Sequence, residues 1–378
     1  MKRIGIIDAD LIGRARHRFP NLACMKISAF HKAQGDTVRL LTSYDGLEEY
    51  DHLYLSKVFT DTPVPERVLS LGNLSYGGTG FFYDNAPPLP DAIEHHFPDY
   101  HLYDSWVTQQ LARGGKATDF AFYNNYSIGF LTRGCFRQCS FCVNRNYHRV
   151  MRHSPLQEFL DPRRPKICLL DDNFFGSPDW SEMLIDLQAT GKPFIFKQGL
   201  DERLLTEGKC KALFASKYDG DYIFAFDNVA DAPLIESKIQ LARQYTNAVM
   251  KFYCFCGFDR NDVWDDAFWS QDIMDLFTRI AILMRNRCLP YVMRFARYTE
   301  SPYRGMYVTI ARWCNQPSFF KKKTLREFIA ANGENSAAAR YAREFEAAHP
   351  ESSVFFDMRF PTSTVRSNMH NSKPDNCT

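Results

Sequence analysis

Three cysteines in one short stretch constrain this chain of 378 residues more than any other feature. Cys135, Cys139 and Cys142 follow the spacing C-x3-C-x2-C, and an aromatic residue, Phe141, precedes the last of them. Thiolates are soft metal ligands, and cysteines this close together can face a single iron–sulfur cluster. A cubane cluster has four irons, so three thiolates leave one iron open to a ligand that is not protein.

The stretch resembles the C-x3-C-x-aromatic-C signature of the radical S-adenosylmethionine (radical SAM) enzymes. The resemblance implies a [4Fe–4S] cluster on Cys135, Cys139 and Cys142, with S-adenosylmethionine chelated to the open iron through its amino and carboxylate groups. In that family an electron from the cluster breaks the sulfonium and releases a 5′-deoxyadenosyl radical. A flavodoxin or ferredoxin would supply the electron, and Phe141 would lie near the adenine.

A zinc site is the main alternative for these cysteines. His148 is the nearest histidine and would complete a C-x3-C-x2-C-x5-H set. Structural zinc sites, however, usually take four ligands, often as two separated pairs. The polar, loop-like Gly-Cys-Phe-Arg sequence around Cys135 also argues against three core cysteines, so the cluster interpretation is favoured.

Length, charge and cysteine usage predict a cytoplasmic protein. The chain is long enough for two domains or for one large barrel with additions. A net charge of +2 gives no bias toward nucleic acid or membrane. We expect neither a signal peptide nor a membrane span. Eleven cysteines in irregular spacing argue against a disulfide framework and for a reducing compartment.

The sequence of the amino-terminal third predicts a parallel α/β unit. Its expected elements are strands at residues 3–7, 37–41 and 51–55 and a helix at residues 21–34. Strand, helix and strand at this spacing predict a Rossmann-like sheet, and ligands of such sheets bind at the carboxyl ends of the strands.

The loops at these strand ends are similar to those of cobalamin-binding domains, whose first loop carries D-x-H-x-x-G. The matching positions are Asp8, Gly13, Ser56, Gly77 and Gly78. Asp10 stands where the cobalt-ligating histidine would be, and carboxylate is a poor replacement for imidazole on cobalt. The resemblance therefore implies the fold without the cofactor. Cobalamin held without a protein ligand stays open, beside the favoured interpretation of a plain α/β cap that binds no ligand.

From residue 126 onward, apolar runs alternate with helix-like stretches. The expected strands are 127–132, 166–170, 194–197, 221–226, 249–254 and 290–295, with helices at 180–190 and 234–245 among the connections. Six such units predict a partial parallel (β/α)6 barrel whose chemistry lies at the carboxyl ends of its strands. The radical SAM resemblance covers about residues 126–297.

Site roles follow from that resemblance. The family often has Gly-Gly-Glu after its second strand, and here that place holds Asp171, Asp172 and Asn173. Asp172 or Asn173 is expected near the amino group of S-adenosylmethionine. Arg203 is a candidate for the carboxylate, with a solvated arginine as the alternative. The remaining candidates are Asp227 and Asn228 for the ribose hydroxyls and Met293 and Arg294 for the adenine.

Cys254 and Cys256 raise the question of a second cluster. Alternation along a strand puts both thiols on one face. No further cysteine pair lies nearby in the sequence, and buried cysteines are common in barrel strands. Core packing is therefore the favoured interpretation, and a core or surface position is also expected for Cys24, Cys168, Cys210, Cys288, Cys314 and Cys377.

These predictions combine into an α/β fold with four parts. They are a cobalamin-binding-like Rossmann domain (1–116), a radical SAM partial TIM barrel (117–300), a helical carboxyl-terminal extension (301–360) and a disordered tail (361–378). The implied activity is reductive cleavage of S-adenosylmethionine for radical modification of an unknown substrate. The alternatives are a cobalamin-dependent radical SAM methyltransferase and a non-catalytic metal- or cluster-binding module.

Overall fold

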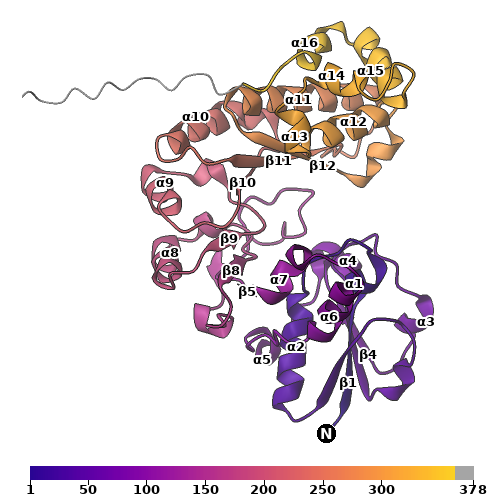
Figure 1. Cartoon of the computed structure of the whole chain (residues 1–378), viewed down its shortest axis with the longest axis vertical. Coiled ribbons are helices and arrows are strands. Elements are labelled where there is room, and N and C mark those ends of the chain that lie inside the picture. The colour runs from indigo at the N-terminus through magenta and orange to yellow at the C-terminus, as the bar shows by residue number, and fades with distance from the viewer. Residues whose placement is uncertain (362–378) are drawn as a thin grey trace, which may run out of the picture. The chain divides into compact units, whose positions relative to one another are not determined.

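The computed structural model describes residues 1–361 and shows a mixed α/β protein with parallel sheets (Figure 1). Its backbone forms two compact units. The first contains residues 1–225 and 237–248, and the second contains residues 226–236 and those from 249 onward. Residues 362–378, most of the predicted disordered tail and the position of Cys377, lie outside the described residues. The predicted four-part division stays a prediction.

A four-stranded parallel sheet, in the order β2-β1-β3-β4, opens the first unit. Its strands are β1 (Arg3–Asp8), β2 (Thr37–Leu41), β3 (His52–Ser56) and β4 (Leu74–Gly77). β1 pairs with β2 and β3, and its Ile4, Ile6 and Ile7 are fully buried, as a central parallel strand requires. The three expected strands are confirmed. The edge strand β4 was missed because Ser75 and Tyr76 are exposed and leave it no apolar run.

Two apolar layers cover this sheet. On one face, Ile4 and Ile6 pack against α2 (Leu22–Ala33) and against α6 (Asp104–Ala112) with its preceding tyrosines. On the other face, Ile7 packs with Leu53 and Leu55. The helix expected at residues 21–34 is confirmed as α2, and Asn21 caps it by accepting a hydrogen bond from the Cys24 amide. The short α1 (Ala9–Gly13) follows β1 directly.

The second sheet of the first unit contains β5, β8 and β9 in that order, all parallel. The elements of this region are β5 (Tyr126–Gly129), β6 (Thr132–Arg133), β7 (Met151–Arg152), β8 (Lys166–Leu169), α8 (Trp180–Ala189), β9 (Phe194–Phe196), α9 (Glu207–Phe214) and β10 (Tyr222–Ala225). A bridge between Leu200 and Phe224 joins β10 to the loop after β9.

The prediction of one strand at 127–132 is wrong in one respect, because the structure has two strands there, β5 and β6. The amides of Leu131 and Thr132 donate to the carboxylate of Asp171, at 3.2 and 2.7 Å, rather than to a neighbouring strand. β6 then turns away to form an antiparallel pair with β7. The other five strands expected from residue 166 onward are present.

The two sheets of the first unit share a core. Leu22, at the start of α2, packs with Ile128, Cys168 and Ile195 of the second sheet, and Phe19 lies against the same cluster. The carboxyl-end loops of both sheets therefore belong to one packed body.

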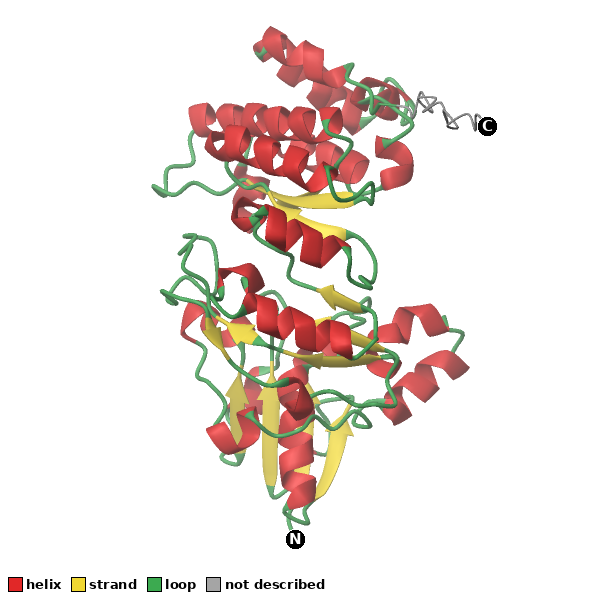
Figure 2. Cartoon of the chain, turned by 90° about the vertical axis from the view of Figure 1, so that its left-hand side faces the viewer, coloured by secondary structure: helices red, strands yellow, loops and turns green. Residues whose placement is uncertain are grey.

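The second unit is built on the parallel pair β11 (Met250–Cys256) and β12 (Leu289–Arg294). Its helices lie mainly on one face of that pair (Figure 2). They are α11 (Asp266–Arg285), α12 (Arg304–Cys314), α13 (Pro317–Phe320), α14 (Leu325–Ala330), α15 (Ala337–Ala348) and α16 (Ser353–Phe356). The expected helix at 234–245 is α10 (Ala232–Arg243), within which the chain passes back to the first unit at residue 237.

Local sequence explains where the last helices begin. Thr324 and Glu327 form a capping box at α14, and the Ser336 hydroxyl caps α15 by accepting from the Ala339 amide. The buried rings of Phe345 and Phe356 pack against Phe277 of α11. Across residues 1–361, no helix combines the length and apolar character that a membrane crossing would need.

Candidate functional site

The three cysteines lie on the loop of residues 134–148, called the cysteine loop below, which follows β6. Gly134 has φ +92°, and a Cβ there would stand 2.4 Å from the carbonyl oxygen of Arg149, so only glycine fits this turn. The Cys142 amide donates to the Cys139 carbonyl at 2.9 Å and tightens the loop. All three thiols are half-buried, so they are held by the fold and still accessible.

Amide groups point at two of the sulfurs. The Arg137 amide and Asn173 Nδ2 each lie 3.4 Å from Cys135 Sγ, and the Asn144 amide lies 3.4 Å from Cys142 Sγ. Donors of this kind stabilise a thiolate and are typical around cluster-ligating sulfur. The donor chemistry therefore fits an iron–sulfur cluster. In the described part of the chain, no three His, Cys, Asp or Glu side chains already stand in a metal-binding group. His148 pairs with Gln138 through its ring Nδ1.

Two buried aspartates after β8 brace the entrance of the cysteine loop. Asp171 accepts hydrogen bonds from the Thr132 amide and hydroxyl at 2.7 and 2.6 Å. Asp172 accepts from the Gly134 amide at 2.8 Å and from Asn144 Nδ2 at 2.6 Å. Burial raises the pKa of Asp171 to about 7, and burial also raises the pKa of Asp172. Asp172, one of the candidates for the amino group, thus holds the loop itself.

Asn173 presents an acceptor without a donor. Its Nδ2 reaches the sulfur of Cys135, whereas its Oδ1 is buried and accepts no hydrogen bond among the described residues. The whole residue is 2% exposed. A buried carbonyl oxygen left without a donor costs free energy unless a ligand supplies one. Asn173 therefore offers a place for an ammonium group beside the first thiol.

The loop after β9 reaches the cysteine loop through an arginine. Asp201 accepts from Arg137 Nε at 2.6 Å and from Arg203 Nε at 2.8 Å. Neighbouring Glu202 is 1% exposed; its Oε2 accepts from the Ala225 amide at 3.1 Å, and its Oε1 accepts no hydrogen bond among the described residues. Burial, aided by Asp201, raises the pKa of Glu202 to about 8. Sequence reasoning missed Glu202, although it belongs to the acidic cluster after β9.

The amino-terminal part also contacts the cysteine loop. The Tyr83 hydroxyl donates to the carbonyl of Phe141 at 2.5 Å. The carboxylate of Asp84 accepts from Arg145 Nε at 2.6 Å, and its carbonyl accepts from Asn146 Nδ2 at 3.0 Å. No local pattern predicted these contacts, because the partners lie about sixty residues apart.

At the first sheet, Asp10 is fully buried and used internally. Its carboxylate accepts from the amides of Val58 and Phe59, at 2.7 and 3.4 Å, and from the Thr62 hydroxyl. The nearby Arg14 pairs with Asp61 at 2.6 Å. Asp10 thus closes the loop after β3.

Other residues of the cobalamin-like set have structural partners as well. Asp8 accepts from the Tyr103 hydroxyl at 2.8 Å, and Ser56 Oγ accepts from Asn21 Nδ2 at 2.8 Å. Gly78 has φ +104°, and a Cβ there would lie 2.2 Å from the carbonyl oxygen of Lys57. The glycine is therefore required by a close backbone approach, with no ligand needed to explain it.

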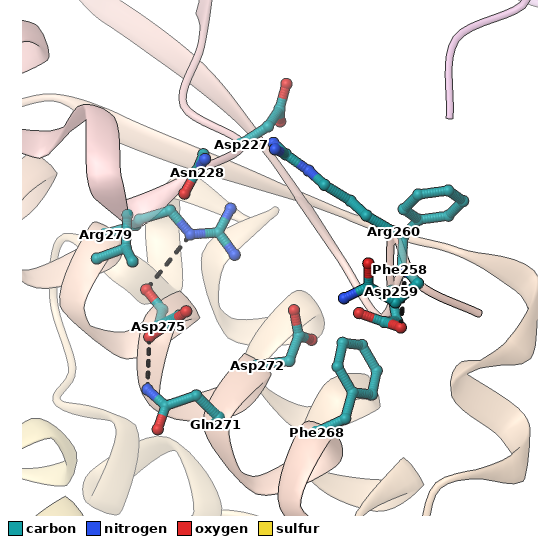
Figure 3. Close-up of a pocket in the computed structure, with 12 residues that line it drawn as sticks. Asp227, Asn228, Phe258, Asp259, Arg260, Phe268, Gln271, Asp272, Asp275 and Arg279 are labelled. Atoms are coloured by element: carbon teal, nitrogen blue, oxygen red, sulfur yellow. Dashed lines mark hydrogen bonds between the residues drawn. The ribbon is translucent and has the colours of Figure 1, made fainter. Parts of the chain in front are cut away.

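In the second unit, Asp227 and Asn228 line a pocket of about 290 Å³ (Figure 3). Asp227 Oδ1 accepts from the Phe255 amide at 2.9 Å. The side chain of Arg260 extends across the pocket toward these two residues. Arg279 also lines this pocket and is only 2% exposed. Its guanidinium donates to the carbonyls of Phe226 and Phe255, each at 2.9 Å.

Met293 and Arg294 lie on β12 and are not among the residues lining that pocket. The Met293 carbonyl accepts from Cys256 Sγ at 3.4 Å, and the Arg294 guanidinium lies 4.4 Å from the Tyr298 ring centre. Cys254 and Cys256 are both buried on β11, as the core interpretation expects.

The structure thus brings Phe141, Asp172 and Asn173 together around the cysteines, with Arg203 joined through Asp201. The other candidates, Asp227, Asn228, Met293 and Arg294, belong to the second unit.

Comparison with known proteins gives a fold relationship. No protein-family model and no curated protein sequence matches the chain. Among solved structures, it is similar to TsrM, a radical S-adenosylmethionine methyltransferase from Kitasatospora setae whose structure holds cobalamin and a [4Fe-4S] cluster. The TM-score is 0.51 at 10% identity, covering 77% of this chain and 74% of that chain. The cobalamin-dependent S-adenosylmethionine radical enzyme OxsB aligns with a TM-score of 0.35 at 13% identity, covering 78% of this chain and 49% of that chain. The likeness to TsrM shows a common fold.

Proposed function

We propose that this protein is a radical SAM enzyme that holds a [4Fe–4S] cluster on Cys135, Cys139 and Cys142. One observation carries the proposal. Three half-buried thiols share one loop, amides point at two of their sulfurs, and the buried acceptor of Asn173 stands beside the first thiol. The fold shared with TsrM supports the same function.

When bound, the cluster and S-adenosylmethionine would supply an electron and a 5′-deoxyadenosyl radical for abstraction of a substrate hydrogen atom. The chain's own residues bind and orient these groups. Asn173 Oδ1 would accept a hydrogen bond from the amino group, and Arg203 would approach the carboxylate while Asp201 fixes its Nε. Phe141 would lie along the adenine. Loading the cluster would draw the three sulfurs together, within a loop already braced by Asp172.

In the second unit, Asp227 and Asn228 are proposed for the ribose hydroxyls, because both line its pocket. Met293 and Arg294 are proposed for the adenine on the family resemblance alone. An electron donor such as flavodoxin or ferredoxin and a cytoplasmic location stay predictions.

The test is anaerobic reconstitution with iron and sulfide, followed by reduction with dithionite in the presence of S-adenosylmethionine. We expect visible sulfur-to-iron absorbance and formation of 5′-deoxyadenosine and methionine, measured by chromatography. The Cys135→Ala variant treated in parallel is the control for cluster-independent breakdown. A fully loaded, reduced protein that yields no 5′-deoxyadenosine, even with candidate substrates, would favour the binding module. Bound zinc without iron would favour the zinc site.

A cobalamin-dependent methyltransferase is the second candidate, because the structure of TsrM, which shares this fold, holds cobalamin. Both carboxylate oxygens of Asp10 accept hydrogen bonds from the loop after β3, which argues against Asp10 as a cobalt ligand. Cobalamin would therefore have to bind this chain without an axial side chain from that position. Equilibrium dialysis with hydroxocobalamin separates the two candidates.

A further inference from the structure

A short segment of the amino-terminal part is hydrogen-bonded to the cysteine loop on both sides of its third cysteine. This segment, Tyr83–Asn85, is called the strap below. On the near side of Cys142, the Tyr83 hydroxyl donates to the Phe141 carbonyl at 2.5 Å. On the far side, Asp84 holds Arg145 at 2.6 Å and Asn146 at 3.0 Å. The strap therefore fixes the chain immediately before and shortly after this ligand.

The backbone of the strap is strained. Tyr83 has φ 48° and ψ −107°, a conformation that residues other than glycine rarely adopt. Such a conformation persists only where the surroundings impose it, and it is often found at functional sites. Here the hydroxyl is bonded to the cysteine loop, and the Arg145 guanidinium lies 6.0 Å from the ring centre. The contacts to the cysteine loop thus coincide with the strained residue.

We propose that Tyr83 and Asp84 are positioning residues that set the place of Cys142, and with it the stability and environment of the cluster. They act through the cysteine loop and touch neither cluster nor substrate. The inference rests on the proposed function and deepens it, because it assigns the amino-terminal part a role at the cluster site that does not require cobalamin. Through the strap, the amino-terminal part holds Cys142 in place.

Two substitutions remove the contacts with little change of shape, and each has a matched control. Tyr83→Phe removes one hydroxyl, and its control is Tyr76→Phe, a tyrosine of β4 that is 43% exposed. Asp84→Asn weakens the pair with Arg145, and its control is Asp61→Asn, which weakens the exposed pair with Arg14. Thermal unfolding of all four variants reports any general loss of stability.

The first measurement uses the metal-free full chain. Hydrogen–deuterium exchange of peptides covering residues 139–147 should be about fivefold faster in Tyr83→Phe and Asp84→Asn than in the wild type, as expected for loss of one hydrogen bond. The two controls should exchange at the wild-type rate. Equal exchange in all five proteins would overturn the inference without involving iron.

The second measurement uses the reconstituted protein. Iron release to a ferrous chelator should be about five- to tenfold faster in the two strap variants, and the electron paramagnetic resonance spectrum of the reduced cluster should change. If the wild type loads a cluster and the strap variants match the controls in both readouts, the inference fails and the proposed function stands. If the wild type loads no cluster under any condition, both fail.

Discussion

Two sets of loops in the first unit occupy equivalent places, at the carboxyl ends of parallel strands, and they differ in how their polar groups are satisfied. At the first sheet, the Asp10 carboxylate receives three donors from the loop after β3, and Ser56 receives one from Asn21. At the second sheet, Oδ1 of Asn173 and Oε1 of Glu202 are buried and accept no hydrogen bond among residues 1–361. The Tyr44 hydroxyl, in the loop after β2, is also buried without a partner among these residues. The carboxylate at the first edge is therefore closed by its own loop (the closed edge), whereas two side-chain acceptors at the second are left open (the open edge).

The difference separates a structural edge from a functional one. A buried acceptor without a donor costs about 1–3 kcal/mol, so a fold retains it where a ligand repays the cost. Asp10 shows the reverse case: its fully buried carboxylate is used to hold a loop of the chain itself. The same parallel-sheet geometry thus serves packing at one edge and, in our proposal, cofactor binding at the other.

The largest effect should come from removing the thiols of the open edge. The triple variant Cys135→Ala, Cys139→Ala, Cys142→Ala should lose nearly all of the iron, about four per chain in a loaded cubane. Cys256→Ala is the matched control, because that buried thiol belongs to the core of the second unit. Iron and sulfide are measured after identical anaerobic reconstitution. A full complement of both in the triple variant would refute the cluster assignment.

The next largest effect concerns the closed edge. Asp10→Ala leaves two part-buried amides and a buried hydroxyl without their acceptor and should lower the free energy of unfolding by about 3 kcal/mol. Asp61→Ala, which removes a largely exposed carboxylate, should change it little. Urea titration followed by circular dichroism measures both.

The same variant tests the cofactor. Hydroxocobalamin should bind weakly or not at all to either the wild type or Asp10→Ala in equilibrium dialysis. Tight stoichiometric binding that is unchanged in Asp10→Ala would mean that the cofactor is held without this residue, and the methyltransferase would become the first candidate.

Most of the strand pattern was predictable, because buried parallel strands such as β1 and β8 are apolar runs that end in polar loops. The edge strand β4 was not, since its exposed Ser75 and Tyr76 break that rule. The longest helix, α11, also went unpredicted, although Trp269, Ile273 and Leu276 repeat at helical spacing in its sequence.

That the three cysteines share one loop could be predicted because their spacing is local, and their role as cluster ligands stays a prediction. The contacts that hold the cysteine loop in place could not be predicted from the sequence. Tyr83 is 58 residues from Phe141, and Arg137 is 64 residues from Asp201. Only the tertiary structure brings such pairs together, and no local periodicity encodes them.

A smaller effect should appear in the pH dependence of stability at the closed edge. Burial raises the pKa of Asp8 from 3.8 to about 7, with a further contribution from Asp10. The folded state therefore holds a proton that the unfolded state releases, and Asp8 contributes stability that is lost as the pH rises from about 4 to about 7. We expect Asp8→Asn to remove about 2 kcal/mol of this decline.

The measurement is urea unfolding at several pH values between 4 and 8, compared between wild type and Asp8→Asn. Asp61→Asn is the control, because that carboxylate is largely exposed and pairs with Arg14. Parallel stability curves for wild type and Asp8→Asn would mean that Asp8 is ionised in the folded state.

The smallest effect, and the one that most sharpens the comparison, concerns Asn173. Asn173→Leu keeps the branched shape of the side chain but removes the buried Oδ1, which accepts no hydrogen bond among the described residues. If that oxygen accepts a hydrogen bond from the amino group of S-adenosylmethionine, affinity for S-adenosylmethionine should fall about tenfold. Stability should stay the same or rise, because the unsatisfied acceptor is removed and the one side-chain bond that Asn173 loses among the described residues is the weak one from Nδ2 to Cys135 Sγ. Equilibrium dialysis with labelled S-adenosylmethionine, on samples of equal iron content, measures the affinity. Wild-type affinity in Asn173→Leu would show that the open acceptor serves another ligand, and the functional meaning of the open edge would have to be sought at Glu202.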